Sequence, residues 1–330
     1  MKTIRWGMIG CGSVTEVKSG PGFYKAAGSS LAAVCSRRPE AARGFAQRHG
    51  VSVVWDTSEQ LVADPNLDAV YIATPPDSHK ALALLAAQAG KHVYVEKPMA
   101  LCFSECAEIV EACAKHGVRL YVAFYRRAMP RFLKVKEWID SGRIGQVRCV
   151  RVVQHLAPAA EELSPDTLPW RLKPEVAGGG KFLDMGVHVL DMLDSWFGPI
   201  DAVSGHAANL GGLYEVEDTV SASWRHAGGV LGSGSWCYVS GMGQDRVEII
   251  GSQGRIELEF FSDSPLRLER ANGGEEVMIP NPEHVQQPFI QSIVDELNGI
   301  AACPGSVESA MNTSRVADDI LGEYRRCRGW

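Results

Sequence analysis

Three residues of this sequence are suited to moving a proton at an oxygen atom: Lys97, Asp184 and His188. Histidine exchanges a proton near neutral pH, and a desolvated or crowded lysine can do the same because its pKa is lowered. Asp184 and His188 are four residues apart, so on a helix they share a face and can interact. Oxidation of an alcohol needs such a base for the hydroxyl proton while hydride leaves the carbon. The three residues therefore predict acid–base chemistry at an alcohol or a ketone.

Each of these residues also has a purely structural interpretation. Lys97 can pair with an aspartate or a glutamate, and an isolated histidine more often packs or caps within a helix than it catalyses. Asp191, which follows His188 by about one helical turn, is expected to be structural. The catalytic interpretation depends on the joint pattern rather than on any one of the three residues.

A glycine-rich loop starts at Gly10, after an apolar run at residues 4–9 and before a helix-forming stretch at residues 14–27. Gly10 permits a tight turn, Gly12 lets the backbone approach a pyrophosphate, and the helix N-terminus offers unpaired N–H groups. Thr15 replaces the third glycine of the usual fingerprint, and its β-branched side chain needs more room against the strand. The order strand, loop, helix predicts a dinucleotide-binding site. The loop residues expected to contact the cofactor are Gly10, Cys11, Gly12, Ser13 and Val14.

The end of the second predicted strand, where Ser36, Arg37 and Arg38 follow Cys35, bears on the choice between NAD and NADP. NAD recognition usually places an Asp or Glu there to bind the ribose 2′-hydroxyl, and such an acid would repel a 2′-phosphate. A serine hydroxyl and a guanidinium bind phosphate instead. We therefore predict that NADP(H) is preferred over NAD(H), with Ser36, Arg37 and Arg38 as contacts. The alternative is that the two arginines are only solvated surface charges.

Short apolar stretches alternate with helical stretches along the first third of the chain, which predicts a parallel, doubly wound sheet of the Rossmann type. Further strands are expected at residues 31–35, 51–55, 69–73, 92–95 and 120–124. Helices are expected at residues 39–49, 79–89 and 104–116, the last two ending at Gly90 and Gly117.

The pattern changes after Phe124, where period-two alternation predicts a mostly antiparallel, open sheet. Strands are expected at residues 147–155, 219–226, 230–236 and 246–260, the last folded as a hairpin at residues 251–254, and helices at residues 130–141, 285–299 and 307–325. The fold class is therefore α/β, with a dinucleotide-binding Rossmann domain at residues 1–123 and an α+β substrate-binding and oligomerisation domain at residues 124–330. We expect a homodimer or homotetramer through the second sheet, because Trp224, Trp236 and Tyr238 are costly to leave in water.

The composition excludes several classes of protein. With 330 residues the chain suits two domains of ordinary size. It carries 33 Lys and Arg against 39 Asp and Glu, a net charge of −6, without the basic stripe that is typical of nucleic-acid binding. We expect no membrane partner, because no apolar run is long enough to span a bilayer and the first residues do not resemble a signal peptide.

The nine cysteines lie mostly in apolar patterns, such as Cys106 and Cys113 at helical spacing with Ile109. This usage is typical of reduced proteins, and we expect a cytoplasmic location. Cys102 and Cys106 are four residues apart, but no second pair and no suitably spaced histidine follows them. No metal site is therefore expected.

Two stretches together carry a family resemblance: residues 90–100, with Glu96-Lys97-Pro98 after a predicted strand, and residues 178–191, with three glycines before Asp184 and His188. They resemble the Gfo/Idh/MocA family of oxidoreductases. The resemblance covers nearly the whole chain, including residues 73–79, Tyr125-Arg126-Arg127 and Trp170-Arg171.

This resemblance implies a role for individual residues. Lys97 and His188 would hydrogen-bond the reacting oxygen, and Asp184 would orient or relay. Members of the family differ in which group donates the proton, and we favour His188 with Lys97 assisting. Glu96 would lie near the nicotinamide, and Pro98 would follow a cis peptide that aims Lys97 into the cleft. Further cofactor contacts are implied at Thr74, Pro75, His79, Glu96 and Lys97.

Four residues are candidates for substrate contacts, because arginines and aromatic rings suit a polyhydroxylated ring: Tyr125, Arg127, Trp170 and Arg171. For each of them alone, a packed aromatic ring or a surface ion pair is an equally good interpretation.

The sequence thus predicts an NADP(H)-preferring oxidoreductase that interconverts a secondary alcohol and a ketone on a sugar, a cyclitol or a related diol. Within the same family, one alternative is a glycosidase that retains NAD and cleaves a glycosidic bond through transient oxidation. Another alternative is a nicotinamide-binding regulator without catalysis, which would have no need of Lys97, Asp184 and His188. A plain sugar-binding module is disfavoured by the glycine loop. The substrate and the physiological direction stay open, because a few side chains of the second domain decide specificity.

Overall fold

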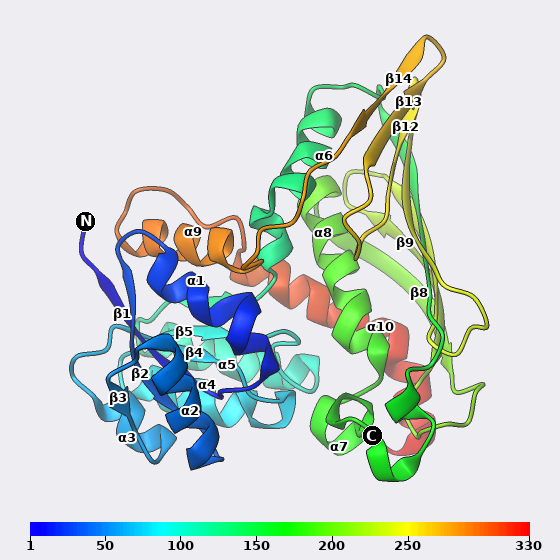
Figure 1. Cartoon of the computed structure of the whole chain (residues 1–330). Coiled ribbons are helices and arrows are strands. Elements are labelled where there is room, and N and C mark those ends of the chain that lie inside the picture. The colour runs from blue at the N-terminus through cyan, green and yellow to red at the C-terminus, as the bar shows by residue number, and fades with distance from the viewer. The chain divides into compact units, whose positions relative to one another are not determined.

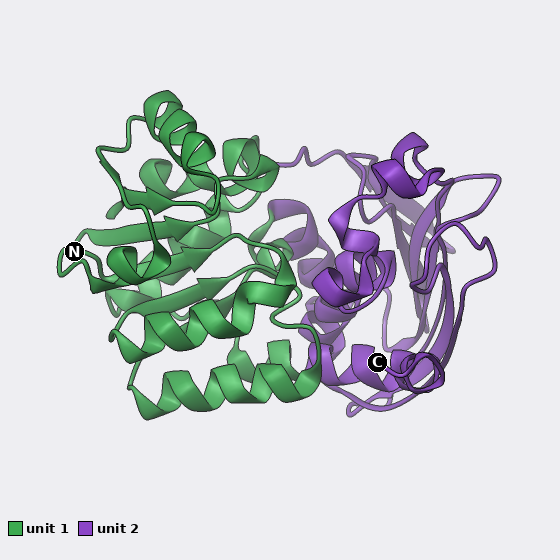
Figure 2. Cartoon of the chain, turned by 90° about the horizontal axis from the view of Figure 1, so that it is seen from below, with its two compact units in different colours: residues 1–129, 282–311 green, residues 130–281, 312–330 purple.

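The structure is a computed structural model that describes residues 1–330, and the chain divides into two compact units (Figure 2). Unit 1 consists of Met1–Met129 and Pro282–Met311, and unit 2 consists of Pro130–Asn281 and Asn312–Trp330. The units differ from the predicted ranges, 1–123 and 124–330, because the chain returns to unit 1 after residue 281. Each unit has its own sheet.

The sheet of unit 1 is parallel, with the strand order β3-β2-β1-β4-β5-β6, as a Rossmann fold requires (Figure 1). Its strands are β1 (Ile4–Ile9), β2 (Ser29–Cys35), β3 (Val53–Val54), β4 (Ala69–Ile72), β5 (His92–Val95) and β6 (Leu120–Val122). The order reverses between β1 and β4, and the loop that starts at Gly10 follows β1 at this switch point. All four residues of β4 are buried, which is why the strand reads as a continuous apolar run.

The helices of unit 1 are α1 (Gly20–Lys25), α2 (Pro39–His49), α3 (Ser58–Ala63), α4 (His79–Gln88), α5 (Phe103–Lys115) and α9 (Gln287–Leu297). Local signals set the bounds of α2, which begins at Pro39 and ends before Gly50 in the left-handed conformation. The helix predicted at residues 14–27 is divided instead into a π-helical turn, Thr15–Ser19, and α1.

Helix α9 was predicted as part of the second domain, but it belongs to unit 1. Its apolar face buries Phe289, Ile290 and Ile293, and the helix packs against α1. The ring of Phe289 lies 6.0 Å from that of Tyr94 on β5. An amphipathic pattern predicts that a helix buries one face, but it does not say which surface it covers.

The sheet of unit 2 has the strand order β14-β13-β12-β11-β7-β10-β9-β8. Its strands are β7 (Val147–His155), β8 (Ile200–Ala208), β9 (Thr219–His226), β10 (Leu231–Cys237), β11 (Gln244–Gly251), β12 (Gly254–Leu258), β13 (Leu266–Arg270) and β14 (Gly273–Val277). Only β7 and β10 pair in parallel, so the expected mostly antiparallel sheet is confirmed. β11 and β12 form the predicted hairpin. β8, β13 and β14 were not predicted, because small and charged residues hide their alternation.

Three longer helices accompany this sheet: α6 (Pro130–Asp140), α8 (Val187–Phe197) and α10 (Val307–Arg328), of which α10 begins in unit 1 and belongs to unit 2 from Asn312. A short helix, α7 (Pro174–Ala177), precedes the three glycines. Figure 1 shows α6 and α8 along one face of the sheet. No helix of the structure has both the length and the apolar composition that crossing a membrane requires.

The aromatic residues of the sheet do not reach solvent. Trp236 and Tyr238 are fully buried, and Trp224 is 4 % exposed. Trp236 packs edge-on against Phe182, with ring centroids 5.0 Å apart. The prediction that these rings need a second subunit to cover them is therefore wrong. The opposite face carries small polar residues, among them Ser221, Ser223, Ser233 and Ser235.

Candidate functional site

The cofactor loop in unit 1 has the backbone that its glycines predicted. Gly10 has a φ of 102°, and a β-carbon there would lie 2.6 Å from the carbonyl oxygen of Ala73. A β-carbon at Gly12 would meet no atom within 4 Å. The loop is therefore close-packed against β4 at Gly10 and open at Gly12, which fits the approach of a pyrophosphate.

Thr15 supports this loop rather than weakening it. Its side chain is fully buried, and its Oγ1 donates a hydrogen bond to the carbonyl oxygen of Gly12 at 2.8 Å. The position where only a glycine fits lies one π-helical turn later, because a β-carbon at Gly20 would overlap the carbonyl oxygen of Thr15. Because Gly20 supplies the close approach, the helix tolerates a β-branched residue at position 15.

Ser36, Arg37 and Arg38 lie directly after β2, as predicted. The N–H of Arg38 donates to Ser36 Oγ at 3.3 Å, and both arginine side chains are exposed. The carboxyl end of β2 thus presents a hydroxyl and two guanidinium groups to solvent.

Glu96 is the last residue before Lys97 at the end of β5, and its carboxylate is held by a buried network. Oε1 accepts hydrogen bonds from the Tyr71 hydroxyl at 2.7 Å and from Gln286 Nε2 at 2.6 Å. The Tyr94 hydroxyl donates to Gln286 Oε1 at 2.7 Å. Burial, followed by the charge of Glu96, raises the pKa of Tyr71 and Tyr94 well above its usual value, so both phenols stay protonated as donors. The network positions the backbone that presents Lys97.

Lys97 follows this network, and the peptide bond between Lys97 and Pro98 is cis, as expected. The backbone N–H of Lys97 donates to Glu96 Oε2 at 3.3 Å. The buried imidazole of His79 lies behind the turn, with Nδ1 2.9 Å from the carbonyl oxygen of Pro98 and Nε2 2.8 Å from that of Thr74. Burial lowers the pKa of His79, so the ring is neutral near pH 7 and donates to one carbonyl at a time.

His79 therefore differs from the prediction that it contacts the cofactor. Its side chain has no exposed surface, and it instead holds Thr74 and Pro98 in place. Thr74 and Pro75 are half-buried, and Thr74 Oγ1 accepts a hydrogen bond from Ser78 Oγ at 2.8 Å. The difference arises because a sequence motif does not distinguish a residue that touches a ligand from one that supports it.

Tyr125 and Arg127 are buried in a 3₁₀ turn, Tyr125–Ala128, that packs against α9. Arg127 Nη1 donates to the carbonyl oxygen of Pro304 at 3.3 Å. The structure thus places Arg127 as an anchor for the returning segment of unit 1. Its predicted role as a substrate contact gains no support from this position.

The glycine segment of unit 2 begins the stretch that carries Asp184 and His188. The backbone N–H of Gly180 donates to Glu217 Oε1 at 2.8 Å, and a β-carbon at Gly180 would overlap the Glu217 carbonyl oxygen. Glu217 is 1 % exposed, and burial raises its pKa to about 7 against the opposing effect of the Gly180 N–H. The next residue, Lys181, forms a buried ion pair with Glu162 at 2.6 Å.

Asp184 lies in a π-helical turn, Phe182–Gly186, which leads directly into α8. Arg171 Nε is 3.4 Å from Asp184 Oδ2, an ion pair in which both side chains are about one-third exposed. The Arg171 guanidinium also lies 5.0 Å from the centroid of the Trp170 ring. The structure therefore brings two predicted substrate residues to a predicted catalytic residue.

His188 lies in the first turn of α8 and is 5 % exposed. Four residues span about one turn, so Asp184 and His188 lie on the same side of the helical segment, as their spacing predicted. The ring of Phe261 stands edge-on to the imidazole, with centroids 6.4 Å apart and an interplanar angle of 73°. Lys97 belongs to unit 1, whereas Asp184 and His188 belong to unit 2.

Several residues around the site were missed by the sequence analysis, namely Gln286, Glu217, Arg131 and Phe261. Gln286 lies 190 residues from the carboxylate that it binds, so no local pattern could find it. Glu217 had a recognisable signal, because two acids, Glu217 and Asp218, precede the alternating residues of β9. A buried acid with a strongly raised pKa is a candidate member of a functional site.

Two family models and several known proteins match this chain. Residues 4–124 match a family described as "Oxidoreductase family, NAD-binding Rossmann fold", and residues 132–257 match the "GFO/IDH/MocA C-terminal domain". The chain is 37 % identical to Oxidoreductase P35 of Formosa agariphila over 97 % of this chain and 98 % of that protein. It is 31 % identical to a 1,5-anhydro-D-fructose reductase of Ensifer adhaerens, covering 76 % and 74 % of the two chains.

Two proteins of Thermotoga maritima are also similar. A myo-inositol 2-dehydrogenase is 30 % identical over 82 % of this chain and 79 % of its own. The crystal structure of an oxidoreductase superposes with a TM-score of 0.84 at 27 % identity, covering 97 % and 96 % of the chains.

Proposed function

Because the chain belongs to the Gfo/Idh/MocA family of NAD-binding oxidoreductases, it is a nicotinamide-dependent dehydrogenase or reductase of CH–OH groups, and we propose a sugar, a cyclitol or a related diol as its substrate. The observation that carries the proposal is the cluster of Trp170, Arg171 and Asp184. It combines an aromatic face with hydrogen-bonding groups, which suits a polyhydroxylated ring. Relatives named for a cyclitol and a keto sugar support this class.

Hydride transfer at the reacting carbon is the chemistry that a nicotinamide supplies when bound. The chain's own residues would manage the proton. His188 takes the hydroxyl proton during oxidation or returns it during reduction, while Lys97 donates a hydrogen bond to the same oxygen. Asp184 orients the imidazole, and Arg171 holds the carboxylate of Asp184 in place.

The cofactor would rest on the loop at Gly10 and Gly12, whose open side fits a pyrophosphate. We propose that NADP(H) is preferred, because Ser36, Arg37 and Arg38 offer a hydroxyl and two positive charges after β2. A bound 2′-phosphate would form ion pairs with these guanidinium groups, whereas a 2′-hydroxyl carries no negative charge.

The test combines cofactor titration with the variant Lys97→Ala. We expect the purified protein to bind NADPH more tightly than NADH, and a panel of sugars, inositols and keto sugars to change the nicotinamide absorbance. Lys97→Ala should keep its cofactor affinity and lose about 10²-fold to 10⁴-fold in turnover, the usual contribution of a positioned proton-transfer group. Lys115→Ala, at the exposed end of α5, is the matched control and should behave as the wild type.

Three outcomes would contradict parts of the proposal. Tighter binding of NADH would refute the preference for NADP(H). Unchanged turnover in Lys97→Ala would refute its role at the reacting oxygen. Release of sugar from a glycoside without net change in nicotinamide absorbance would refute the dehydrogenase function and favour the glycosidase that retains NAD.

A further inference from the structure

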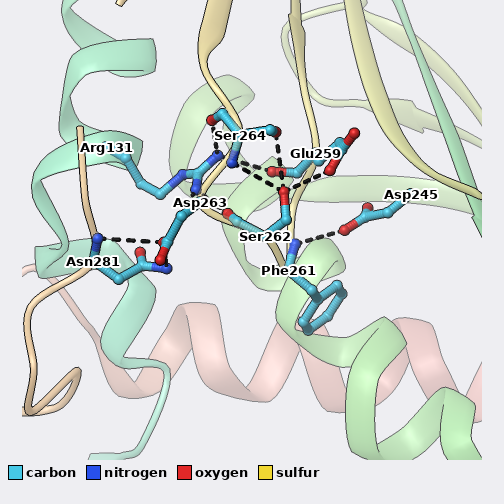
Figure 3. Close-up of polar contacts among 8 residues, drawn as sticks. All are labelled: Arg131, Asp245, Glu259, Phe261, Ser262, Asp263, Ser264 and Asn281. Atoms are coloured by element: carbon cyan, nitrogen blue, oxygen red, sulfur yellow. Dashed lines mark hydrogen bonds and ion pairs between the residues drawn. The ribbon is translucent and has the colours of Figure 1, made fainter. Parts of the chain in front are cut away.

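One loop of unit 2, residues 259–264 between β12 and β13, is held by a single buried arginine (Figure 3). Arg131, in the first turn of α6, is 1 % exposed. Its guanidinium donates to the carbonyl oxygens of Glu259 at 3.0 Å and Ser264 at 3.2 Å, and to that of Ser262. A guanidinium has five N–H donors in a fixed fork, so it can hold three carbonyls at once. We call residues 259–264 the clamped loop.

The clamped loop is also restrained on both sides of Phe261. The backbone N–H of Phe261 donates to Asp245 Oδ2 at 2.6 Å, and Ser262 Oγ donates to Glu259 Oε2 at 2.6 Å. Asp263 Oδ1 accepts the backbone N–H of Asn281 at 3.3 Å. In Figure 3 the Phe261 ring points away from this polar cluster, toward α8.

The ring of Phe261 ends beside the imidazole of His188, in the edge-to-face arrangement given above. A helix fixes the backbone of His188, but the direction of its ring depends on the side chains that pack around it. An aromatic edge against a face is a preferred contact, and it restricts rotation of both rings.

We infer that Phe261 is a positioning residue for His188, and that Arg131 acts on the same imidazole through the clamped loop. The inference rests on the proposed function, in which His188 exchanges the proton. It adds that α8 alone does not orient the imidazole, because the ring of Phe261, which lies outside α8, also packs against it.

The first test is Phe261→Leu in the full chain, with two readouts. The ¹H and ¹³C resonances of the His188 ring, assigned by their loss in His188→Gln, should shift because the ring current of Phe261 disappears. kcat should fall on the order of tenfold, since small errors of position in a reacting group are costly. The dissociation constant for NADPH, which reports on the loop in unit 1, should not change.

The second test is Arg131→Met, which keeps the apolar part of the side chain and removes the clamp. It should shift the same His188 resonances and lower kcat, although Phe261 itself is intact. Arg131→Lys should give an intermediate effect, because one ammonium cannot reach three carbonyls in the fork geometry. If Arg131→Met does not fold, Phe261→Leu still decides the role of the ring.

The matched control is Phe197→Leu. Phe197 is also half-buried in unit 2 and stands edge-on to a histidine, His226, with centroids 5.3 Å apart and an angle of 71°. This variant should shift the resonances of His226, leave those of His188 unchanged and keep wild-type turnover.

Unchanged His188 resonances together with unchanged kcat in Phe261→Leu would overturn the inference. Failure of the proposed function is a separate outcome, because it appears as wild-type turnover in His188→Gln. In that case shifted His188 resonances in Phe261→Leu would still support the contact between the two rings. An unchanged kcat in Phe261→Leu would refute the role of Phe261 in catalysis.

Discussion

Glu217 is a buried carboxyl group of unit 2, and its protonation makes the stability of the protein depend on pH. Its Oε1 accepts the N–H of Gly180, and the charges of Arg325 and Asp218 act on it with opposite sign. Burial is the largest influence and raises its pKa from the ordinary 4.5 to about 7. The native protein therefore retains a proton that the unfolded chain has lost over this range of pH.

We predict that Glu217 makes stability fall with rising pH. The free energy of unfolding that the raised pKa of Glu217 contributes is fully present below about pH 4.5. It falls by up to about 3 kcal/mol as the pH rises to about 7. Glu217→Gln has no such titration and can still accept the Gly180 N–H. Urea unfolding should therefore show the variant gaining free energy of unfolding relative to the wild type between pH 5 and pH 8. A constant difference across this range would contradict the assignment.

Other single residues show how chemistry and support are divided in this fold. Lys97, Asp184 and His188 could be named from the sequence because their types and spacing are unusual together. His79 was also named, but the structure makes it a buried support for Thr74 and Pro98. A residue type predicts what chemistry is available, whereas burial decides whether a ligand can reach it.

Two π-helical turns distinguish this chain at the scale of elements. Thr15–Ser19 follows the cofactor loop, and Phe182–Gly186 carries Asp184. Such turns are rare and frequently occur at functional sites. Close to each turn a glycine outside it permits a close approach, Gly20 to Thr15 in unit 1 and Gly180 to Glu217 in unit 2.

Gly180→Ala tests the second of these approaches. The added β-carbon would overlap the Glu217 carbonyl oxygen, and the Gly180 carbonyl accepts the N–H of Leu183, at the start of the turn that holds Asp184. We expect a loss of about 1–3 kcal/mol in the free energy of unfolding and a fall in kcat, with unchanged cofactor affinity. The control is Gly241→Ala, where a β-carbon meets no atom within 4 Å. Wild-type stability and turnover in Gly180→Ala would show that the loop can shift without cost.

At the scale of the whole molecule, we propose that a second copy of the chain covers the outer face of the unit 2 sheet. Small residues there, such as Ser221, Ser223, Ser233 and Ser235, leave a flat surface to which another sheet can approach closely. Beside them, β11 and β12 carry Arg246 paired with Glu257 and Arg255 paired with Glu248, so both charges are available to a matching copy.

Light scattering on the purified protein should therefore give the mass of a homodimer or homotetramer. Ser223→Arg puts a long charged side chain in the middle of the small face and should lower the mass to that of one chain, with an unchanged circular dichroism spectrum. Ala114→Arg, on the exposed side of α5, should keep the wild-type mass. A monomeric wild type would refute the proposal.

The sequence alone determined the Rossmann sheet, the cofactor loop and the candidate proton-transfer residues. These features follow from local periodicity, from backbone freedom at Gly10 and from residue types at fixed short spacing. Only the tertiary structure decided that α9 belongs to unit 1, where Gln286 before it binds Glu96. It also decided that Trp236 faces inward and that Arg131 supports the loop of Phe261. The reason is physical: a local pattern reports which face of an element is buried, but its partner is selected by packing over the whole chain.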